Sequence, residues 1–125
     1  MYLLDTHAVL WMLGSEDKLS DTVKSIIRSS DSVYISMISF WEIEIKKNKG
    51  RLTFDHTIKE AEDICRRSGI SILDIKADHI DTLDVLPMIH SDPFDRLLVA
   101  QAISEDMTVV TKDENIPLYG VKTAW

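Results

Sequence analysis

Short uninterrupted apolar runs alternate along the chain with segments in which apolar residues recur every three or four positions. The runs are typical of buried strands, and the helically spaced segments are typical of amphipathic helices. Strands are predicted at residues 2–4, 32–36, 70–75 and 107–111, with a last short strand in the tail after Pro117. Helices are predicted at residues 7–13, 20–29, 39–48, 57–67, 78–86 and 92–106.

This alternation predicts an α/β fold, because strands linked through helices normally pair in parallel. We expect a single domain over residues 1–125, since a chain of this length forms one core and is too short for two. Its centre should be a mostly parallel sheet of four to five strands, flanked by helices on both faces. The helix at 92–106 is apolar nearly all round and should be largely buried.

Four carboxylates share one local context, although they are far apart in the sequence. Asp5, Glu42, Asp95 and Asp113 each lie where an apolar run ends or a helix pattern begins, in YLLD, SFWEI, DPFDRLL and TVVTKD. In a parallel α/β sheet such positions lie at the carboxyl ends of the strands, where these folds bind ligands. Converging carboxylates repel one another unless a cation neutralises them. Oxygen ligands favour Mg²⁺ or Mn²⁺, so we predict a site for one of these ions.

The first two carboxylates also have purely structural interpretations. Asp5 can accept backbone N–H groups as the N-cap of the helix that follows. Glu42 completes a capping box with Ser39, and it can form an ion pair with Lys46 one helical turn later. Neither residue alone indicates a metal site.

The other two carboxylates have structural alternatives as well. Asp95 is at the third position of its helix, where the helix dipole favours a negative charge. On a helical wheel, however, it falls between Val99 and Ala102, and a charge in apolar surroundings needs a partner. Asp113 can form a turn, and Glu114 is a competing ligand beside it. The combination of the four, rather than any one, favours a metal site.

The net charge of −7, from 14 basic and 21 acidic residues, argues against an ordinary basic nucleic-acid-binding surface. The basic residues are nevertheless unevenly distributed, with a cluster at Lys46, Lys47, Lys49 and Arg51. Such a cluster is either a solvated helix end or a phosphate-binding surface. Net charge alone does not decide between them.

Cysteine content and hydropathy favour a cytoplasmic protein. Cys65 is the only cysteine, so no internal disulfide can form, and we interpret it as a small buried residue. No apolar stretch approaches the roughly 18 residues needed to cross a bilayer, and no membrane association is expected.

Four segments of the chain resemble the PIN-domain nucleases, and most specifically the VapC-like toxins of prokaryotic type II toxin–antitoxin systems. The segments are LLDTHAVLW (3–11), SMISFWEIEIKKNKGRL (36–52), HSDPFDRLLVAQA (90–102) and VVTKDENIPLYGVKTAW (109–125). The resemblance runs nearly end to end and is weakest between about residues 53 and 86. It implies a compact, three-layer PIN fold with an acidic pocket at one edge of the sheet.

The resemblance also assigns functional residues. It implies that Asp5, Glu42 and Asp95 are metal ligands and catalytic residues, with Asp113 as the more variable fourth. Supporting or phosphate-binding roles fall to Thr6, Lys46, Arg96 and Thr111. His7 and His90 lie beside the motifs, where we interpret them as structural hydrogen-bonding residues rather than bases.

Metal-dependent cleavage of RNA is the activity that this resemblance implies. One or two Mg²⁺ ions would activate a water molecule that attacks the phosphorus in line and leaves a 5′-phosphate and a 3′-hydroxyl. The expected partners are the RNA substrate, a second copy of the chain and a cognate antitoxin whose C-terminal segment covers the site. Two alternatives are a catalytically silent binding module with the same fold and a receiver-like phosphoacceptor domain. The latter usually has an acidic pair after its first strand, whereas Asp5 is followed by Thr6.

Overall fold

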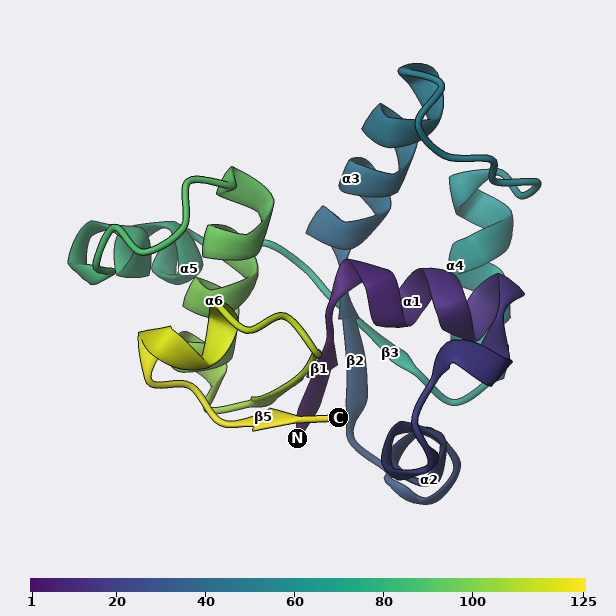
Figure 1. Ribbon diagram of the computed structural model, residues 1–125, viewed down its shortest axis with the longest axis horizontal. Coiled ribbons are helices and arrows are strands. Elements are labelled where there is room, and N and C mark those ends of the chain that lie inside the picture. Colours follow the sequence, from purple (N-terminus) through teal and green to yellow (C-terminus); the bar gives the residue numbers. More distant parts are fainter.

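Five short strands form one sheet in the order β3-β2-β1-β4-β5, and every neighbouring pair is parallel. The computed structural model describes residues 1–125 (Figure 1). Its strands are Tyr2–Leu4 (β1), Val33–Ser36 (β2), Ser71–Leu73 (β3), Thr108–Val110 (β4) and Thr123–Ala124 (β5). The strand order reverses at β1, so the chain segments leaving β1 and β4 diverge and open a crevice at their carboxyl ends. This order also differs from the 2-1-3-4-5 order of receiver-like folds.

Six α-helices and three 3₁₀ turns connect the strands. The helices are Thr6–Gly14 (α1), Asp21–Ser29 (α2), Met37–Asn48 (α3), Ile58–Arg67 (α4), Ala77–Thr82 (α5) and Pro93–Glu105 (α6). The 3₁₀ turns are Glu16–Lys18 (η1), Leu83–Val85 (η2) and Ile116–Tyr119 (η3). None of the helices combines the length and the hydropathy that crossing a lipid bilayer requires.

The helices cover both faces of the sheet, and each face has its own hydrophobic core. Alternate residues of a strand point to opposite faces, so Leu3 belongs to the core under α6 whereas Leu4 belongs to the core under α1 and α4. In Figure 1, α5 and α6 lie on one side of β1, and α1, α2 and α4 lie on the other. The predicted three-layer α/β fold with four to five strands is therefore confirmed.

Cys65 of α4 is fully buried in the core that contains Leu4. Burial raises the pKa of its thiol to about 11, because the apolar surroundings disfavour the thiolate. The interpretation of this residue as a small structural side chain is confirmed.

Two predicted helices differ from the observed ones. The capping box of Ser39 and Glu42 does not form: α3 already begins at Met37, and the Ser36 side chain caps it by accepting the N–H of Ile38 (3.1 Å). Strand β2 therefore passes directly into α3. The helix expected at 78–86 divides into α5 and η2, because Pro87 forces the residue before it into an extended conformation and tightens the last turn.

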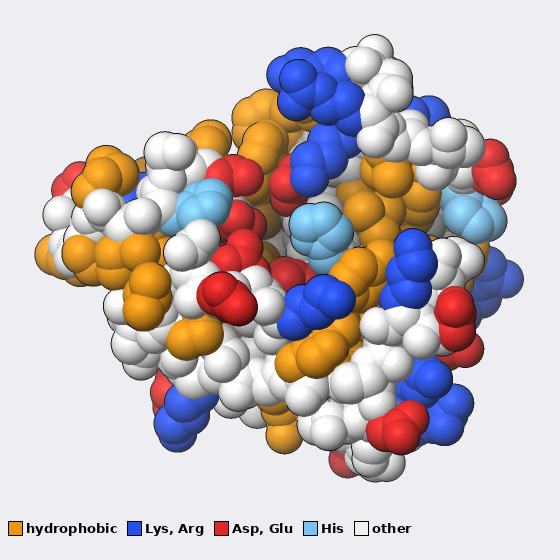
Figure 2. All heavy atoms as spheres, viewed as in Figure 1, with side chains coloured by type: hydrophobic (Ala, Val, Ile, Leu, Met, Phe, Trp, Pro, Cys, Tyr) orange, Lys and Arg blue, Asp and Glu red, His pale blue; other side chains and the backbone are white.

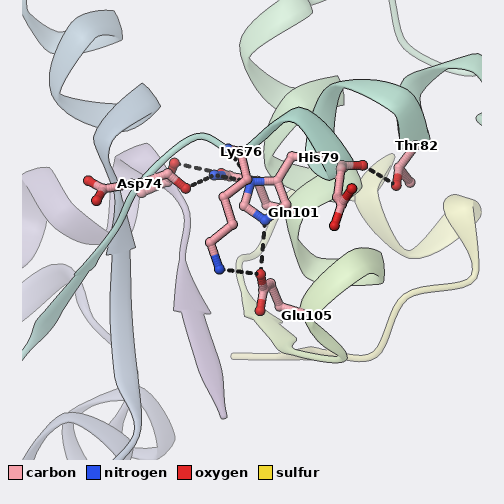
Figure 3. A network of polar contacts seen from close by, with 8 residues as sticks. Asp74, Lys76, His79, Thr82, Gln101 and Glu105 are labelled. Atoms are coloured by element: carbon pink, nitrogen blue, oxygen red, sulfur yellow. Dashed lines mark hydrogen bonds and ion pairs between the residues drawn. The ribbon is translucent and has the colours of Figure 1, made fainter.

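A buried polar network ties α6 to both neighbouring connections. Gln101 is fully buried; its Oε1 accepts from the Ser36 hydroxyl (2.5 Å), and its Nε2 donates to the Asp74 carbonyl (3.4 Å). Figure 3 shows Gln101 beside His79, whose Nδ1 accepts the N–H of Lys76 (3.0 Å) and whose Nε2 lies 3.0 Å from Glu105. Because Ser36 caps α3, this network fixes α3 and α6 relative to each other.

We therefore expect Gln101→Leu to lower the free energy of unfolding by about 2–4 kcal/mol, since it leaves the Ser36 hydroxyl and the Asp74 carbonyl without their partner. Thermal unfolding followed by circular dichroism measures the change. Ser104→Ala, on the exposed side of the same helix, is the control and should unfold like the wild type. Equal melting temperatures for Gln101→Leu and the wild type would show that the network contributes no stability.

Candidate metal centre

The four predicted carboxylates converge at the carboxyl edge of the sheet. Asp5 directly follows β1, Glu42 lies in α3 after β2, Asp95 is in the first turn of α6, and Asp113 follows β4. Figure 2 shows acidic side chains gathered in a hollow at the centre of one face, between the α6 side and the α1 side of the molecule. The sheet thus brings residues from four distant parts of the sequence to one place.

Asp5 is both the N-cap of α1 and a wall of this hollow. Its Oδ1 accepts the N–H of Ala8 (2.8 Å), and only 6 % of the residue is exposed. Burial raises the pKa of its carboxyl, and the negative charge of Asp113 adds to this effect. A hydrogen bond from Thr111 and the Ala8 N–H partly oppose the rise in pKa. The capping interpretation is thus correct, and the second carboxylate oxygen is free of the cap.

Glu42 is held by residues from two helices. Its Oε1 accepts from the Thr6 hydroxyl (2.5 Å), which also lies 3.1 Å from the Ser39 hydroxyl. Its Oε2 lies 3.0 Å from the Lys46 ammonium, one helical turn further along α3. Thr6 therefore contacts one oxygen of Glu42, and the ion pair with Lys46 that the sequence allowed engages the other.

Asp95 has the most perturbed environment of the four. Its pKa rises to about 7, first because the carboxyl is desolvated and then because Asp92, Glu42 and Asp113 repel its charge. His90 opposes the rise, with Nδ1 3.8 Å from Asp95 Oδ2. Burial and the neighbouring carboxylates therefore disfavour the ionised form of Asp95 unless a cation neutralises the cluster.

Asp113 is fixed by a turn and still faces the other carboxylates. Its backbone N–H donates to the Thr111 hydroxyl (3.0 Å), and its Oδ1 accepts the N–H of Asn115 (2.8 Å). Ligand atoms of Asp113, Asp95 and His90 lie within 4.8 Å of one another. The competing residue Glu114 is exposed, so this geometry favours Asp113 as the fourth carboxylate.

His90 is the member of this cluster that the sequence did not identify as a possible ligand. The ring Nδ1 of His90 accepts the backbone N–H of Asp92 (3.1 Å), and the backbone N–H of His90 donates to the Tyr119 hydroxyl (2.8 Å). These are the structural hydrogen bonds expected of it. The sequence signal that could have identified His90 as a neighbour of Asp95 is its position two residues before Asp92, the N-cap of α6.

Arg96 contacts the loop before α6. Its Nη1 donates to the carbonyl of Pro87 (2.9 Å), which fastens residues 87–92 to the helix. A phosphate contact by Arg96 stays a prediction.

The donor set fits a hard divalent cation. It consists mainly of carboxylate oxygens, with the hydroxyls of Thr6 and Thr111 and the ring of His90 beside them. Cys65 of α4 lies in the hydrophobic core that contains Leu4 rather than in the hollow. A cation here would neutralise the carboxylate charges that help to raise the pKa of Asp95.

Comparison with known proteins identifies the family. The PIN domain matches residues 2–122. The chain belongs to the PIN-domain family. Among curated proteins, this PIN domain is 25 % identical to ribonuclease VapC22 of Mycobacterium tuberculosis, over 91 % of this chain and 88 % of the relative.

Solved structures share the fold of this PIN domain. VapBC2 from Rickettsia felis, bound to a DNA fragment from its promoter, aligns with a TM-score of 0.73 and 18 % identity over 98 % of this chain and 96 % of the other. FitAcB from Neisseria gonorrhoeae aligns with a TM-score of 0.67 and 19 % identity over the same shares. The receiver-like alternative is therefore wrong, in agreement with the strand order.

The charge cluster generates a stability prediction. Because the pKa of Asp95 is raised in the folded protein, the fold binds this proton more tightly than the unfolded chain does. Without metal, the free energy of unfolding should then fall as the pH rises from about 4 to about 7. Asp95→Asn should remove much of this dependence and stabilise the metal-free protein by about 1–4 kcal/mol at pH 8. The lost helix-dipole contribution of about 0.3–1 kcal/mol is smaller and does not reverse the sign.

Thermal melts in EDTA between pH 4 and pH 8 test this expectation, and Asp63→Asn on the exposed side of α4 is the matched control. Mn²⁺ should stabilise the wild type and the control but not Asp95→Asn, since binding to the folded state alone raises stability. An Asp95→Asn protein that is less stable than the wild type in EDTA at pH 8 would mean that the carboxylate acts mainly as a helix-start residue.

Proposed function

We propose that this PIN-domain protein is a Mg²⁺- or Mn²⁺-dependent endoribonuclease, the toxin of a toxin–antitoxin pair, acting in the cytoplasm. The single observation that supports the proposal is the mutual proximity of the carboxylates: the charge of Asp113 acts on Asp5, and the charges of Glu42 and Asp113 act on Asp95. Clustered carboxylates lower the stability of the metal-free fold, and such clusters are typical of sites where a cation binds a phosphate. The printed name of the curated relative, a ribonuclease, agrees with this activity.

In the proposed mechanism the four carboxylates would hold the metal ion, and neighbouring groups of the chain orient them. The ion, when bound, would supply an activated water molecule and charge stabilisation at the scissile phosphate, so that no side-chain nucleophile would be needed. Thr6 fixes one oxygen of Glu42, and the Ala8 N–H fixes one oxygen of Asp5. Lys46, at 3.0 Å from Glu42, adds a positive charge where the negative RNA backbone approaches.

Hydrolysis of single-stranded RNA should require the metal and the carboxylates. We expect the purified wild type to cleave RNA with Mn²⁺ or Mg²⁺ and to be inactive in EDTA. The variants Asp5→Asn, Glu42→Gln and Asp95→Asn should each cleave at least about a hundredfold more slowly, because even residues that only support metal ligands typically contribute about 10–100-fold to metal affinity or activity. Denaturing gels of a labelled RNA and identification of the 5′-phosphate and 3′-hydroxyl ends measure the reaction.

Two matched controls, Asp63→Asn and Glu114→Gln, sharpen this test. Asp63→Asn, an equal change of charge on the exposed side of α4, should cleave like the wild type. Asp113→Asn should lose more activity than Glu114→Gln if Asp113 is the fourth ligand. Equal cleavage by the wild type and Asp95→Asn would identify a contaminating nuclease and refute the site. A wild type that binds RNA with metal but never cleaves it would instead indicate a silent binding module.

The partners of this protein are proposed on the same basis. The solved neighbours carry the names of two-component assemblies, VapBC2 and FitAcB, and we infer a cognate antitoxin and a homodimer for this chain. Light scattering after size exclusion should give twice the mass of the chain, and co-expression with the product of an adjacent small gene should yield an inactive complex. A strictly monomeric protein at micromolar concentration would contradict the homodimer.

A further inference from the structure

The hollow of the carboxylates continues along α1 into an aromatic surface. One part of it, with a volume of about 320 Å³, is lined by Asp5, His7, Trp11, Lys112, Asp113 and Trp125. A second part of about 540 Å³ shares His7 and Trp11 with the first. The two parts form one groove, which we call the α1 groove, and it begins at two of the four carboxylates.

Aromatic rings dominate the end of the groove that is next to Asp5 and Asp113. The indole rings of Trp11 and Trp125 meet edge to face with centroids 5.6 Å apart, and the His7 ring lies 5.8 Å from Trp11. Trp11 and Trp125 are half-buried and His7 is exposed, so these rings are accessible from the groove. Trp11 and Trp125 also pack against the core that contains Leu4, so each ring is held from one side and accessible from the other.

The ammonium group of Lys112 lies over the solvent-accessible faces of the two indole rings. It lies 4.9 Å from the Trp11 centroid and 5.9 Å from the Trp125 centroid, and Lys112 is itself exposed. Attraction between an exposed ammonium and an aromatic ring is weaker than stacking of a nucleobase on such a ring. A base can therefore displace Lys112, whose flexible side chain is then free to contact a phosphate.

Further along the groove, cations replace the aromatic rings. Lys18, Lys46 and Arg51 line the second part, together with the ring of Phe54 and the single carboxylate of Asp55. Lys46 also pairs with Glu42, so it connects the carboxylates with this basic wall. Aromatic faces followed by cations are the features with which proteins bind single-stranded nucleic acids.

We propose that the α1 groove is a subsite for single-stranded RNA, in which an unpaired base next to the cleaved phosphate stacks on Trp11 with Lys112 on the backbone. Lys18, Lys46 and Arg51 contact the phosphates of the following nucleotides. The inference rests on the proposed ribonuclease function and adds a requirement for an unpaired strand, because bases inside a duplex are stacked on each other and unavailable to Trp11. It also gives Lys46 and Arg51, two of the four residues of the basic cluster, a role in a chain of net charge −7.

Fluorescence anisotropy with a labelled RNA octamer tests the subsite in full-length protein, in the Asp95→Asn background so that the probe stays intact. Trp11→Leu should weaken binding by about 5- to 100-fold, and Trp11→Phe should retain most of it. Lys112→Ala should lower the salt dependence of log K by about one unit. Trp41→Leu, which removes an exposed tryptophan of α3 outside the groove, is the control and should bind like the parent. The octamer paired with its complement should bind more weakly than the single strand.

The outcomes separate this inference from the proposed function. If the wild type shows no metal-dependent cleavage, the ribonuclease proposal fails; if it cleaves while Trp11→Leu and Lys112→Ala bind RNA as tightly as the parent, only the subsite fails. Because Lys112 is exposed, its variant tests the groove even if Trp11→Leu is unstable. Unchanged RNA affinity combined with loss of binding to the cognate antitoxin would assign the groove to a protein partner and overturn the proposal.

Discussion

The mutual repulsion of four carboxylates at one edge of the sheet is the constraint on which the rest of this structure depends. Strands β1 and β4 are neighbours in the sheet, so Asp5 and Asp113, which follow them, lie close enough for the charge of Asp113 to act on Asp5. The fold opposes the repulsion with oriented donors, among them the Ala8 and Asn115 N–H groups and the Thr6 hydroxyl. Desolvation, and after it the repulsion from Asp92, Glu42 and Asp113, still raises the pKa of Asp95 to about 7. A cation among these carboxylates would neutralise their charge.

The structural and functional interpretations of the carboxylates prove to be compatible. Asp5 caps α1 through Oδ1 alone, and Asp113 closes its turn through Oδ1 alone. Each local bond holds one oxygen and thereby orients the other. Glu42 differs, since Thr6 and Lys46 engage both of its oxygens, and a metal ion would compete with Lys46 for Oε2. The contacts that give each residue a structural role are therefore the same contacts that would preorganise a metal site.

The sequence predicted the local parts of this arrangement and missed the parts that depend on distant contacts. Strand ends and helix starts located Asp5 and Asp95, because both signals lie within a few neighbouring residues. The Ser39 capping box was a reasonable local match, but Ser36 ends β2 in the core and caps α3 first. Gln101 lies inside an apolar helix pattern, and its partners are far away in the chain, so only the fold could reveal its network. Likewise, strand order and the approach of His90 to Asp95 arise from packing rather than from local pattern.

Net charge is a poor guide to what this protein binds, and the reason is geometric. Part of the acidity belongs to the cluster of Asp5, Glu42, Asp95 and Asp113 and part to exposed helix faces, whereas Lys18, Lys46 and Arg51 lie together along one groove. At physiological ionic strength, charges separated by more than about 8 Å are largely screened, so an approaching strand responds to the nearest side chains. The groove leads from those cations over Trp11 to Asp5 and Asp113, where a divalent ion would reverse the local sign. A chain of net negative charge can in this way attract a negatively charged strand locally, along a groove that leads to its carboxylate cluster.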